Sequence, residues 1–226
     1  MPSESPTVGE ILREQAHSRG DHPLLVCDAE RISYADADRR SAQLARGLIA
    51  LGAGKGSHVG LRYPNGAAFV VGMLAAARIG AVVVPFSTFA TTRELGEQLV
   101  GSDTQILLGT ASYRSRDYVQ QLTDVLSTSS LEDERLFDPA APQLRYAIFD
   151  VERLHQLADT VDERRLAAIE DDVDGSDPLT IVYTSGTTSA PKGVVHTHAA
   201  LLNHQRNLNA VRDLTAADKL FCNSPF

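Results

Sequence analysis

The chain has 226 residues, of which 43% are hydrophobic, and its formal net charge at pH 7 is −8. This length and hydrophobic content suit one large α/β domain or two small ones, each with a buried core. The negative charge and the absence of runs of more than two Lys or Arg residues argue against nucleic-acid binding and favour a small-molecule ligand.

The two cysteines and the first residues bear on the compartment. Cys27 and Cys222 lie far apart, so neither a disulfide framework nor a zinc cluster is indicated, which fits a reducing environment. The first ten residues lack the basic and apolar regions of a signal peptide, and no apolar run reaches the length that spans a bilayer. We expect a cytoplasmic protein without a transmembrane segment.

Helical and strand periods alternate through the first half of the chain. Apolar residues at helical spacing, among them Leu44 and Leu48, predict an amphipathic helix over 35–51. The stretch "HVGLRYP", at 58–64, is typical of a short buried strand. Asn65 is then expected to cap the next helix.

That next helix has its own apolar repeat and its own stop signal. Gly80 is expected to end it, and the residues expected at its core face are Val70, Met73, Leu74 and Ala77. A strand follows over 81–85. Thr91 and Glu94 then form a capping-box pattern before another helix, and 104–108 predicts a further strand. Successive strand, helix, strand units indicate an α/β fold: a three-layer, mostly parallel sheet with flanking helices.

The second half is harder to interpret. Residues 112–142 have the mixed composition of a surface connection, although 118–126 has helical spacing. A strand is expected over 144–151 and a short helix over 152–158, and 171–178 forms a polar, acidic approach to the next strand.

The stretch 183–193, "YTSGTTSAPKG", lies between two runs of β-branched residues. Glycine lets backbone amides approach a ligand closely, several hydroxyls can donate, and Lys192 adds a point charge. These are the groups that hold a polyphosphate, although Ser, Thr, Gly and Pro also make ordinary exposed turns. The P-loop of nucleotide hydrolases does not match for two reasons. A proline, not a glycine, precedes Lys192, and the residues after Lys192 are expected to form a strand, not a helix. The similar "GAGKGS" at 52–57 precedes a strand, so we interpret it as a helix-to-strand turn.

The ordered combination in 183–193 resembles the phosphate-binding signature of the adenylate-forming enzymes, the superfamily of acyl-CoA synthetases and peptide-synthetase adenylation domains. Residues 32–87 and 91–109 resemble the N-terminal region of that superfamily as well, most like the acyl-CoA synthetases. The resemblance implies that 1–226 is a partial N-terminal AMP-binding domain, and that the C-terminal domain of the family lies outside it.

The resemblance also implies a reaction and its cofactors. A carboxylate of a small-molecule acid attacks the α-phosphorus of ATP bound with Mg²⁺, and coenzyme A then captures the acyl group from the acyl-adenylate. The residues that match the family's phosphate loop are Thr184, Ser185, Gly186, Thr187, Thr188 and Lys192. Donors and a cation there would stabilise the charge that moves onto the departing pyrophosphate.

Two departures from the family pattern leave alternatives open. Ser189 stands where the commonest signature has glycine, which costs about 1–2 kcal/mol if the backbone requires positive φ. The chain also stops before the family's magnesium, ribose and hinge motifs, so a catalytically incompetent nucleotide-binding or interaction module is the alternative. We further expect exposed sheet surface and self-association if the chain stands alone.

Other candidate residues have plainer interpretations. His196 and His198 alternate on a predicted strand, but no further ligand accompanies them, so a metal site is not favoured. His204 is expected on a helix surface, and Tyr183 is expected in the core. The acidic residues of 171–178 lack the spacing of a calcium loop, and no hydrolase nucleophile elbow is present.

Overall fold

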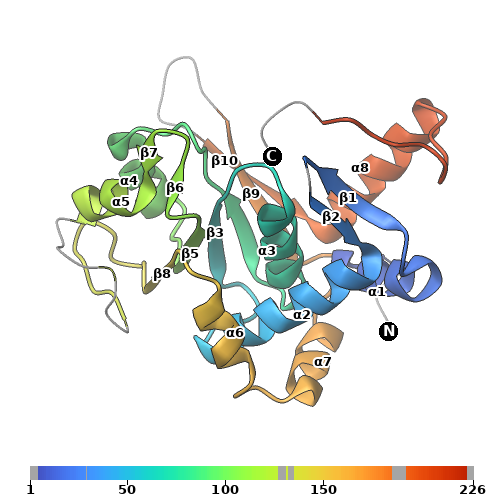
Figure 1. Cartoon of the computed structure of the whole chain (residues 1–226), viewed down its shortest axis with the longest axis horizontal. Coiled ribbons are helices and arrows are strands. Elements are labelled where there is room, and N and C mark those ends of the chain that lie inside the picture. The colour runs from blue at the N-terminus through green and yellow to red at the C-terminus, as the bar shows by residue number, and fades with distance from the viewer. Residues whose placement is uncertain (1–4, 29, 127–130, 132–134, 185–191, 223–226) are drawn as a thin grey trace.

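The computed structural model describes residues 5–28, 30–126, 131, 135–184 and 192–222. Its centre is a six-stranded sheet in which five strands run parallel and one edge strand is antiparallel (Figure 1). The spatial order is β10 (Lys192–Thr197), β9 (Pro178–Thr184), β4 (Val82–Pro85), β3 (His58–Arg62), β5 (Ile106–Gly109) and β8 (Tyr146–Ile148). The mostly parallel sheet is therefore confirmed.

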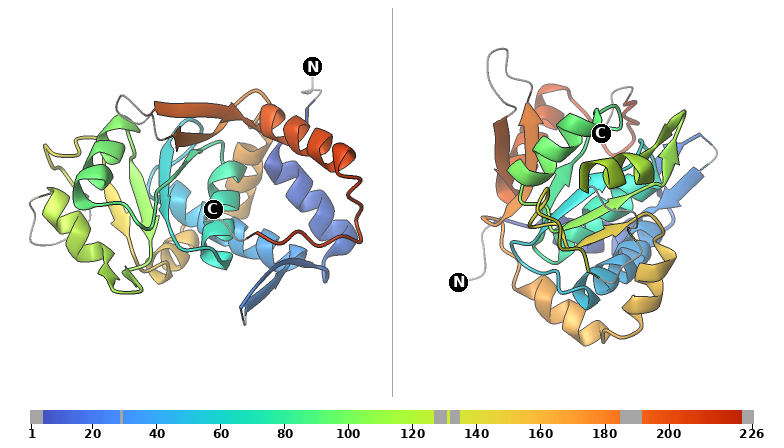
Figure 2. Two further views of the ribbon diagram at one scale, coloured as in Figure 1. Left: turned by 90° about the horizontal axis from the view of Figure 1, so that it is seen from above. Right: turned by 90° about the vertical axis from the view of Figure 1, so that its left-hand side faces the viewer.

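Helices cover both faces of this sheet, which confirms the three-layer arrangement (Figure 2). The helices of the first face are α1 (Val8–Arg19), α2 (Tyr34–Ala50), α3 (Ala67–Arg78), α6 (Glu152–Ala158) and α7 (Glu163–Asp171). The second face carries α4 (Thr92–Gly101) and α5 (Tyr118–Leu126). The last helix, α8 (His198–Val211), follows β10 directly and packs against it.

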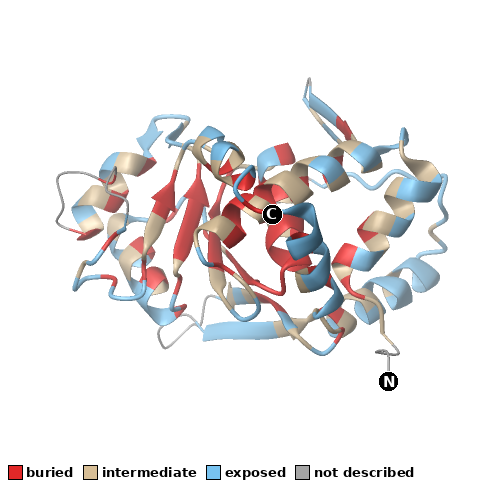
Figure 3. Ribbon diagram, turned by 90° about the horizontal axis from the view of Figure 1, so that it is seen from below, coloured by how far each residue is buried: buried red, intermediate tan, exposed pale blue. Residues whose placement is uncertain are grey.

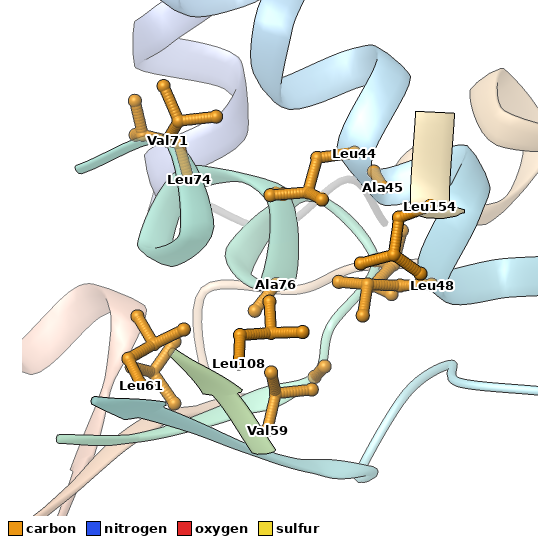
Figure 4. Close-up of a cluster of buried hydrophobic side chains, with 14 of the residues drawn as sticks. Leu44, Ala45, Leu48, Val59, Leu61, Val71, Leu74, Ala76, Leu108 and Leu154 are labelled. Atoms are coloured by element: carbon orange, nitrogen blue, oxygen red, sulfur yellow. The ribbon is translucent and has the colours of Figure 1, made fainter. Parts of the chain in front are cut away.

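Successive side chains of each strand point to opposite faces of the sheet, and a separate hydrophobic core lies on each face. On β3, Val59 and Leu61 point to the first core, where they meet helices α2 and α3 (Figure 4). Gly60 points to the second core, where a Cβ atom would lie within 3.0 Å of Phe86, Leu107 and Thr104. Because Gly60 has no side chain, these three residues can pack directly against the backbone of β3.

Most sequence-predicted elements are present, with boundaries that differ by a few residues. The helix expected over 35–51 is α2, the strands expected at 58–64, 81–85 and 104–108 are β3, β4 and β5, and the capping box of Thr91 and Glu94 begins α4. Gly80 ends α3 with a positive φ of 65°. The helices expected over 118–126 and 152–158 are α5 and α6.

The expected cap of α3 is wrong. Gly66, which has no side chain, occupies the N-cap position, and no side-chain hydrogen bond caps this helix among the residues that the structure describes. The expected core face is also too narrow: Val70 and Met73 are half-buried, whereas Ala75 and Ala76 are fully buried. Helix α3 lies between the sheet and two other helices, α1 and α2. It therefore has buried residues on several sides and not only along one apolar stripe.

Several elements were not anticipated from the sequence. They are α1, α7 and two small hairpins: β1 (Pro23–Cys27) with β2 (Glu30–Ser33), and β6 (Ser112–Tyr113) with β7 (Arg116–Asp117). Much of the connection expected over 112–142 is thus structured, although 127–130 and 132–134 lie outside the described residues. No described helix is long and apolar enough to cross a membrane.

The outer strand β10 is the exposed edge of the sheet in the described part of the chain (Figure 3). Val182 on β9 and Val194 and Val195 on β10 remain 40%, 42% and 57% exposed. This is the uncovered sheet surface that the sequence predicted, and self-association through it stays a prediction.

A buried ion network joins four helices of the first face. The Arg78 guanidinium, 5% exposed, contacts the carboxylates of Glu170 on α7 and Asp38 on α2. Glu170 in turn accepts from Arg13 on α1 at 2.5 Å. Two cations and two carboxylates therefore neutralise one another where α1, α2, α3 and α7 meet.

We predict that Glu170→Gln lowers the free energy of unfolding by about 3 kcal/mol, because Arg78 and Arg13 lose a carboxylate in a buried site. Urea denaturation followed by circular dichroism measures the change. Glu97→Gln is the matched control, since its ion pair with Arg93 on α4 is solvent-exposed and contributes little. Equal stability losses in the two variants would contradict this view of the network.

Candidate functional site

The candidate phosphate loop connects β9 to β10, as the sequence predicted. The two strands form an antiparallel hairpin in which Lys192 stands opposite Thr184 and Gly193 opposite Tyr183. The Thr184 hydroxyl donates to the Lys192 carbonyl at 3.5 Å across the base of the loop. Both residues are exposed. Four predicted loop residues, Ser185, Gly186, Thr187 and Thr188, lie outside the described residues, as does Ser189.

The position of the hairpin in the sheet brings the two ends of this loop, Thr184 and Lys192, to the carboxyl edge of the sheet. β9 runs parallel to β4, so Thr184 lies at the same edge as the carboxyl ends of β3, β4 and β5 (Figure 1). Ligands of α/β proteins bind outside the carboxyl ends of the parallel strands, where successive connections leave to opposite faces. Here α3 follows β3 on the first face and α4 follows β4 on the second.

A cleft of about 1720 Å³ opens beside the hairpin on the second face. One wall is the end of the hairpin, with Tyr183, Thr184 and Gly193. The opposite wall comes from the segment after β4 and from α4, and its residues include Ser87, Phe89, Ala90, Arg93 and Val100. This wall therefore combines apolar side chains with several polar and charged ones.

Tyr183 belongs both to the core and to the cleft. Its ring packs against the second core and lies over Gly193, where a Cβ atom would come within 3.3 Å of the ring. Burial, with a smaller contribution from Asp103, raises the pKa of the Tyr183 hydroxyl, so the group is a neutral donor near pH 7. The predicted core role is correct but incomplete, because Tyr183 also lines the cleft.

The charged side chains of α4 that line the cleft already form hydrogen bonds or ion pairs within the protein. Glu94 closes the capping box, and hydrogen bonds from Thr91 hold the pKa of its carboxyl below the ordinary value. Arg93 pairs with Glu97 at 3.5 Å. Lys192, in contrast, stands exposed at the start of β10, where its ammonium can meet a ligand anion.

The similar "GAGKGS" stretch serves a structural purpose. Lys55 contacts Asp177 at 2.9 Å and the Asp172 carbonyl at 2.6 Å, and its hydrogen bond to Asp177 raises the pKa of its ammonium. This turn precedes β3 and so lies at the amino edge of the sheet, away from the candidate loop. Its interpretation as a helix-to-strand turn is confirmed.

The two histidines after the loop do not share a strand face, so that part of the prediction is wrong. His196 lies on β10, but the strand ends at Thr197, which caps α8, and His198 is the first residue of that helix. The side chain of His198 is fully buried, and its Nδ1 accepts from the Val8 amide at 3.1 Å. His204 is exposed on α8, as expected. Within the described ranges, no three His, Cys, Asp or Glu residues are grouped as a metal site.

The residues of the opposite cleft wall were missed from the sequence. Ser87, Phe89 and Ala90 follow the predicted strand β4 at once, and the start of α4 is next. Since the carboxyl ends of parallel strands share an edge, their position after a strand was the available signal. What the sequence did not show was that Gly101, the last residue of α4, would lie beside the Tyr183 hydroxyl of β9.

The architecture defines a class before any relative is considered: a doubly wound α/β domain with a hydroxyl-rich and lysine-bearing hairpin at the carboxyl edge of its sheet. The family described as "AMP-binding enzyme" matches residues 12–226. The chain therefore belongs to the AMP-binding enzyme family.

Relatives that match include CoA ligases of much greater length. The acyl-CoA ligase sidI of Beauveria bassiana is 30% identical over 226 aligned residues, covering 97% of this chain and 38% of the relative. The long-chain-fatty-acid–CoA ligase FadD13 of Mycobacterium tuberculosis is 32% identical, covering 86% of this chain and 35% of the relative. The chain thus spans less than half the length of these relatives.

Solved structures agree with the fold. The N-terminal domain of FACL13 from Mycobacterium tuberculosis superposes with a TM-score of 0.69 at 28% identity, covering 85% of this chain and 44% of that one. VinN superposes with a TM-score of 0.74 at 20% identity, covering 98% and 51%, which supports the fold alone. The expected N-terminal architecture of an adenylate-forming enzyme is confirmed.

The burial of His198 predicts a dependence of stability on pH. Burial lowers the pKa of this imidazole below its ordinary value of 6.5, although Asp177, Glu10 and Asp174 oppose the shift. The unfolded chain therefore binds a proton more readily than the folded chain as pH falls below about 6.5. Stability should decline in that range.

We predict that His198→Gln, whose amide oxygen can still accept from Val8, loses less free energy of unfolding between pH 6.5 and pH 5 than the original chain. Urea unfolding at several pH values measures the slope. His204→Gln is the control and should retain the original slope, because His204 is exposed. A slope in His198→Gln equal to that of the control would show that His198 does not carry this pH dependence.

Proposed function

We propose that the β9–β10 loop binds the phosphates of Mg-ATP, with Thr184, Ser185, Gly186, Thr187, Thr188 and Lys192 as the binding residues. The observation that carries the proposal is the hairpin itself, which brings Thr184 and Lys192 together at the carboxyl edge of the sheet beside a large cleft. A hydroxyl and an ammonium at the two ends of one loop are suited to phosphate oxygens. Mg²⁺ would arrive on the ATP phosphates.

We further propose that the protein of which this chain forms the AMP-binding part activates a small-molecule carboxylic acid. The carboxylate oxygen forms a bond to the α-phosphorus of ATP, the bond from that phosphorus to the bridging oxygen breaks, and pyrophosphate leaves with the electron pair. The thiolate of coenzyme A then attacks the acyl carbonyl, and AMP departs. The names of the relatives as acyl-CoA and fatty-acid–CoA ligases support this reaction class.

The residues of the hairpin have a defined part in the first step. Negative charge increases on the β- and γ-phosphates as pyrophosphate departs. Donors and a cation that are already held there stabilise the transition state more than the bound substrate. The cleft next to Thr184 offers apolar surface from Phe89, Val100 and Val125 for uncharged parts of the ligands. This reaction belongs in a cytoplasmic setting, where ATP and coenzyme A are available.

We predict that Lys192→Ala weakens Mg-ATP binding by at least about tenfold, since a charge-assisted hydrogen bond contributes roughly 1.5–3 kcal/mol. Thr184→Val should weaken it less, because it removes one neutral donor. Isothermal calorimetry measures both affinities. Lys55→Met is the matched control: it removes the lysine of the similar "GAGKGS" stretch and should leave the affinity unchanged. Unchanged affinity in Lys192→Ala would remove its assigned role.

A second measurement separates catalysis from binding. We predict that the protein catalyses exchange of labelled pyrophosphate into ATP only when a carboxylic acid is supplied, and that Lys192→Ala lowers the exchange rate. A panel of fatty, aromatic and alicyclic acids identifies the substrate class. Tight Mg-ATP binding without exchange for any acid would instead support a nonenzymatic nucleotide-binding module.

A further inference from the structure

The segment between β4 and α4 is held in place by side chains from one other segment. The carbonyl oxygens of residues 88–90 each accept a hydrogen bond from a side chain within residues 116–121. The pairs are Tyr118 with Thr88 at 2.8 Å, Arg116 with Phe89 at 2.9 Å, and Gln121 with Ala90 at 2.8 Å. Three consecutive peptide units are thereby fixed from the side of α5 and its preceding hairpin.

These residues form part of the cleft. Ser87, Phe89 and Ala90 line it opposite the hairpin end that carries Thr184, and we call residues 87–90 the wall segment. Helix α4 begins directly after it, and the first turn of that helix lines the cleft as well. The wall segment therefore lines the same cleft as Thr184 at the end of β9.

Arg62 lies beneath the wall segment and orders the groups that hold it. Its guanidinium carbon sits 3.9 Å from the centre of the Tyr118 ring, and its Nη2 donates to Oε1 of Gln121. With its oxygen taken by Arg62, the Gln121 amide must direct its nitrogen toward the Ala90 carbonyl. The buried Arg62 side chain thus contacts both α5 residues, Tyr118 and Gln121, that donate hydrogen bonds to the wall segment.

Burying the charged side chain of Arg62 destabilises the folded state, which is unexpected for a residue with a purely structural role. Its side chain is completely buried, and within the described residues it has no carboxylate partner and its Nε and Nη1 have no hydrogen-bond acceptor. Burial lowers the pKa of the guanidinium to about 10, so it is still charged near pH 7. A buried charge without a carboxylate partner destabilises the folded state, and contact with an aromatic ring offsets only part of that loss. An apolar side chain would fill the site at lower cost.

We propose that Arg62 is a positioning residue: through Gln121 and Tyr118 it holds the wall segment at the distance from Thr184 that the ligands of the cleft require. The inference rests on the proposed function for the identity of those ligands, Mg-ATP and a carboxylic acid. The rigidity of the wall segment can be measured without any ligand.

The test uses Gln121→Glu, with Arg62→Met as a second variant. The new carboxylate pairs with Arg62, so the thermal midpoint should not fall. The Ala90 carbonyl, however, loses the shorter of its two side-chain hydrogen bonds and keeps only the one from Arg116 at 3.2 Å. We expect the amides of residues 89–91 to exchange hydrogen about tenfold faster, the effect of one lost hydrogen bond. Gln120→Glu on the exposed side of α5 is the matched control and should leave exchange unchanged.

The ligand measurements complete the test. Gln121→Glu should weaken Mg-ATP binding or raise the KM for the acid while kcat changes little, since the loop residues themselves are intact. Unchanged exchange at residues 89–91, or faster exchange with unaltered Mg-ATP affinity and KM, would overturn the proposal. If the unaltered protein binds no Mg-ATP, the proposed function fails, and hydrogen exchange alone then decides whether Arg62 holds the wall segment.

Arg62→Met separates positioning from packing. It keeps the length of the side chain and removes the charge and the contact with Gln121. Faster exchange confined to residues 89–91 supports positioning. Faster exchange spread evenly over the second core would show that Arg62 merely fills space, and would overturn the proposal.

Discussion

The pairing of β9 with β4 is the contact on which the candidate site depends. The hydroxyl of Thr180, itself buried, donates to the Val83 carbonyl at 2.8 Å, and the two residues are partners in the parallel register. This contact joins segments 97 residues apart and inserts the hairpin beside the central strands. Without it, the residues around Thr184 would form an exposed turn of ordinary composition. With it, they lie at the carboxyl edge of the sheet and form one side of a cleft.

Two buried arginines show how the chain treats charge in its interior. Arg78 is neutralised by Glu170 and Asp38, and this network fastens four helices of the first face. Arg62 has an aromatic face and an amide oxygen instead of a carboxylate. The difference follows the location of the two residues. Arg78 lies among helices that build the first core, whereas Arg62 supports the wall segment of the cleft. The folded state loses stability by burying Arg62, and in our proposal it gains a fixed position of the wall segment in return.

The fold was largely predictable because its signals are local. The capping box at Thr91, the helix stop at Gly80 and the alternation of buried strands with amphipathic helices each act within a few residues, and all are present. Failures occurred where a neighbour distant in sequence decided the outcome. His198 begins α8 instead of continuing the predicted strand, and its ring accepts a hydrogen bond from the Val8 amide, 190 residues away in the sequence. Helix α3 is buried on more than one side because α2 covers it, which its apolar periodicity could not indicate.

The sequence by itself determined the family signature, the hydroxyl and lysine chemistry of residues 183–193, and the parallel character of the sheet, because each depends on residue types in a short order. The residues that line the cleft beside Thr184, in contrast, depend on tertiary packing. The wall segment follows β4, the donors to its three carbonyls come from β7 and α5, and the buried Arg62 ends β3, so these residues meet only after the chain has folded. Hydrogen bonds between segments so distant in sequence have no local pattern, and only packing brings their partners together.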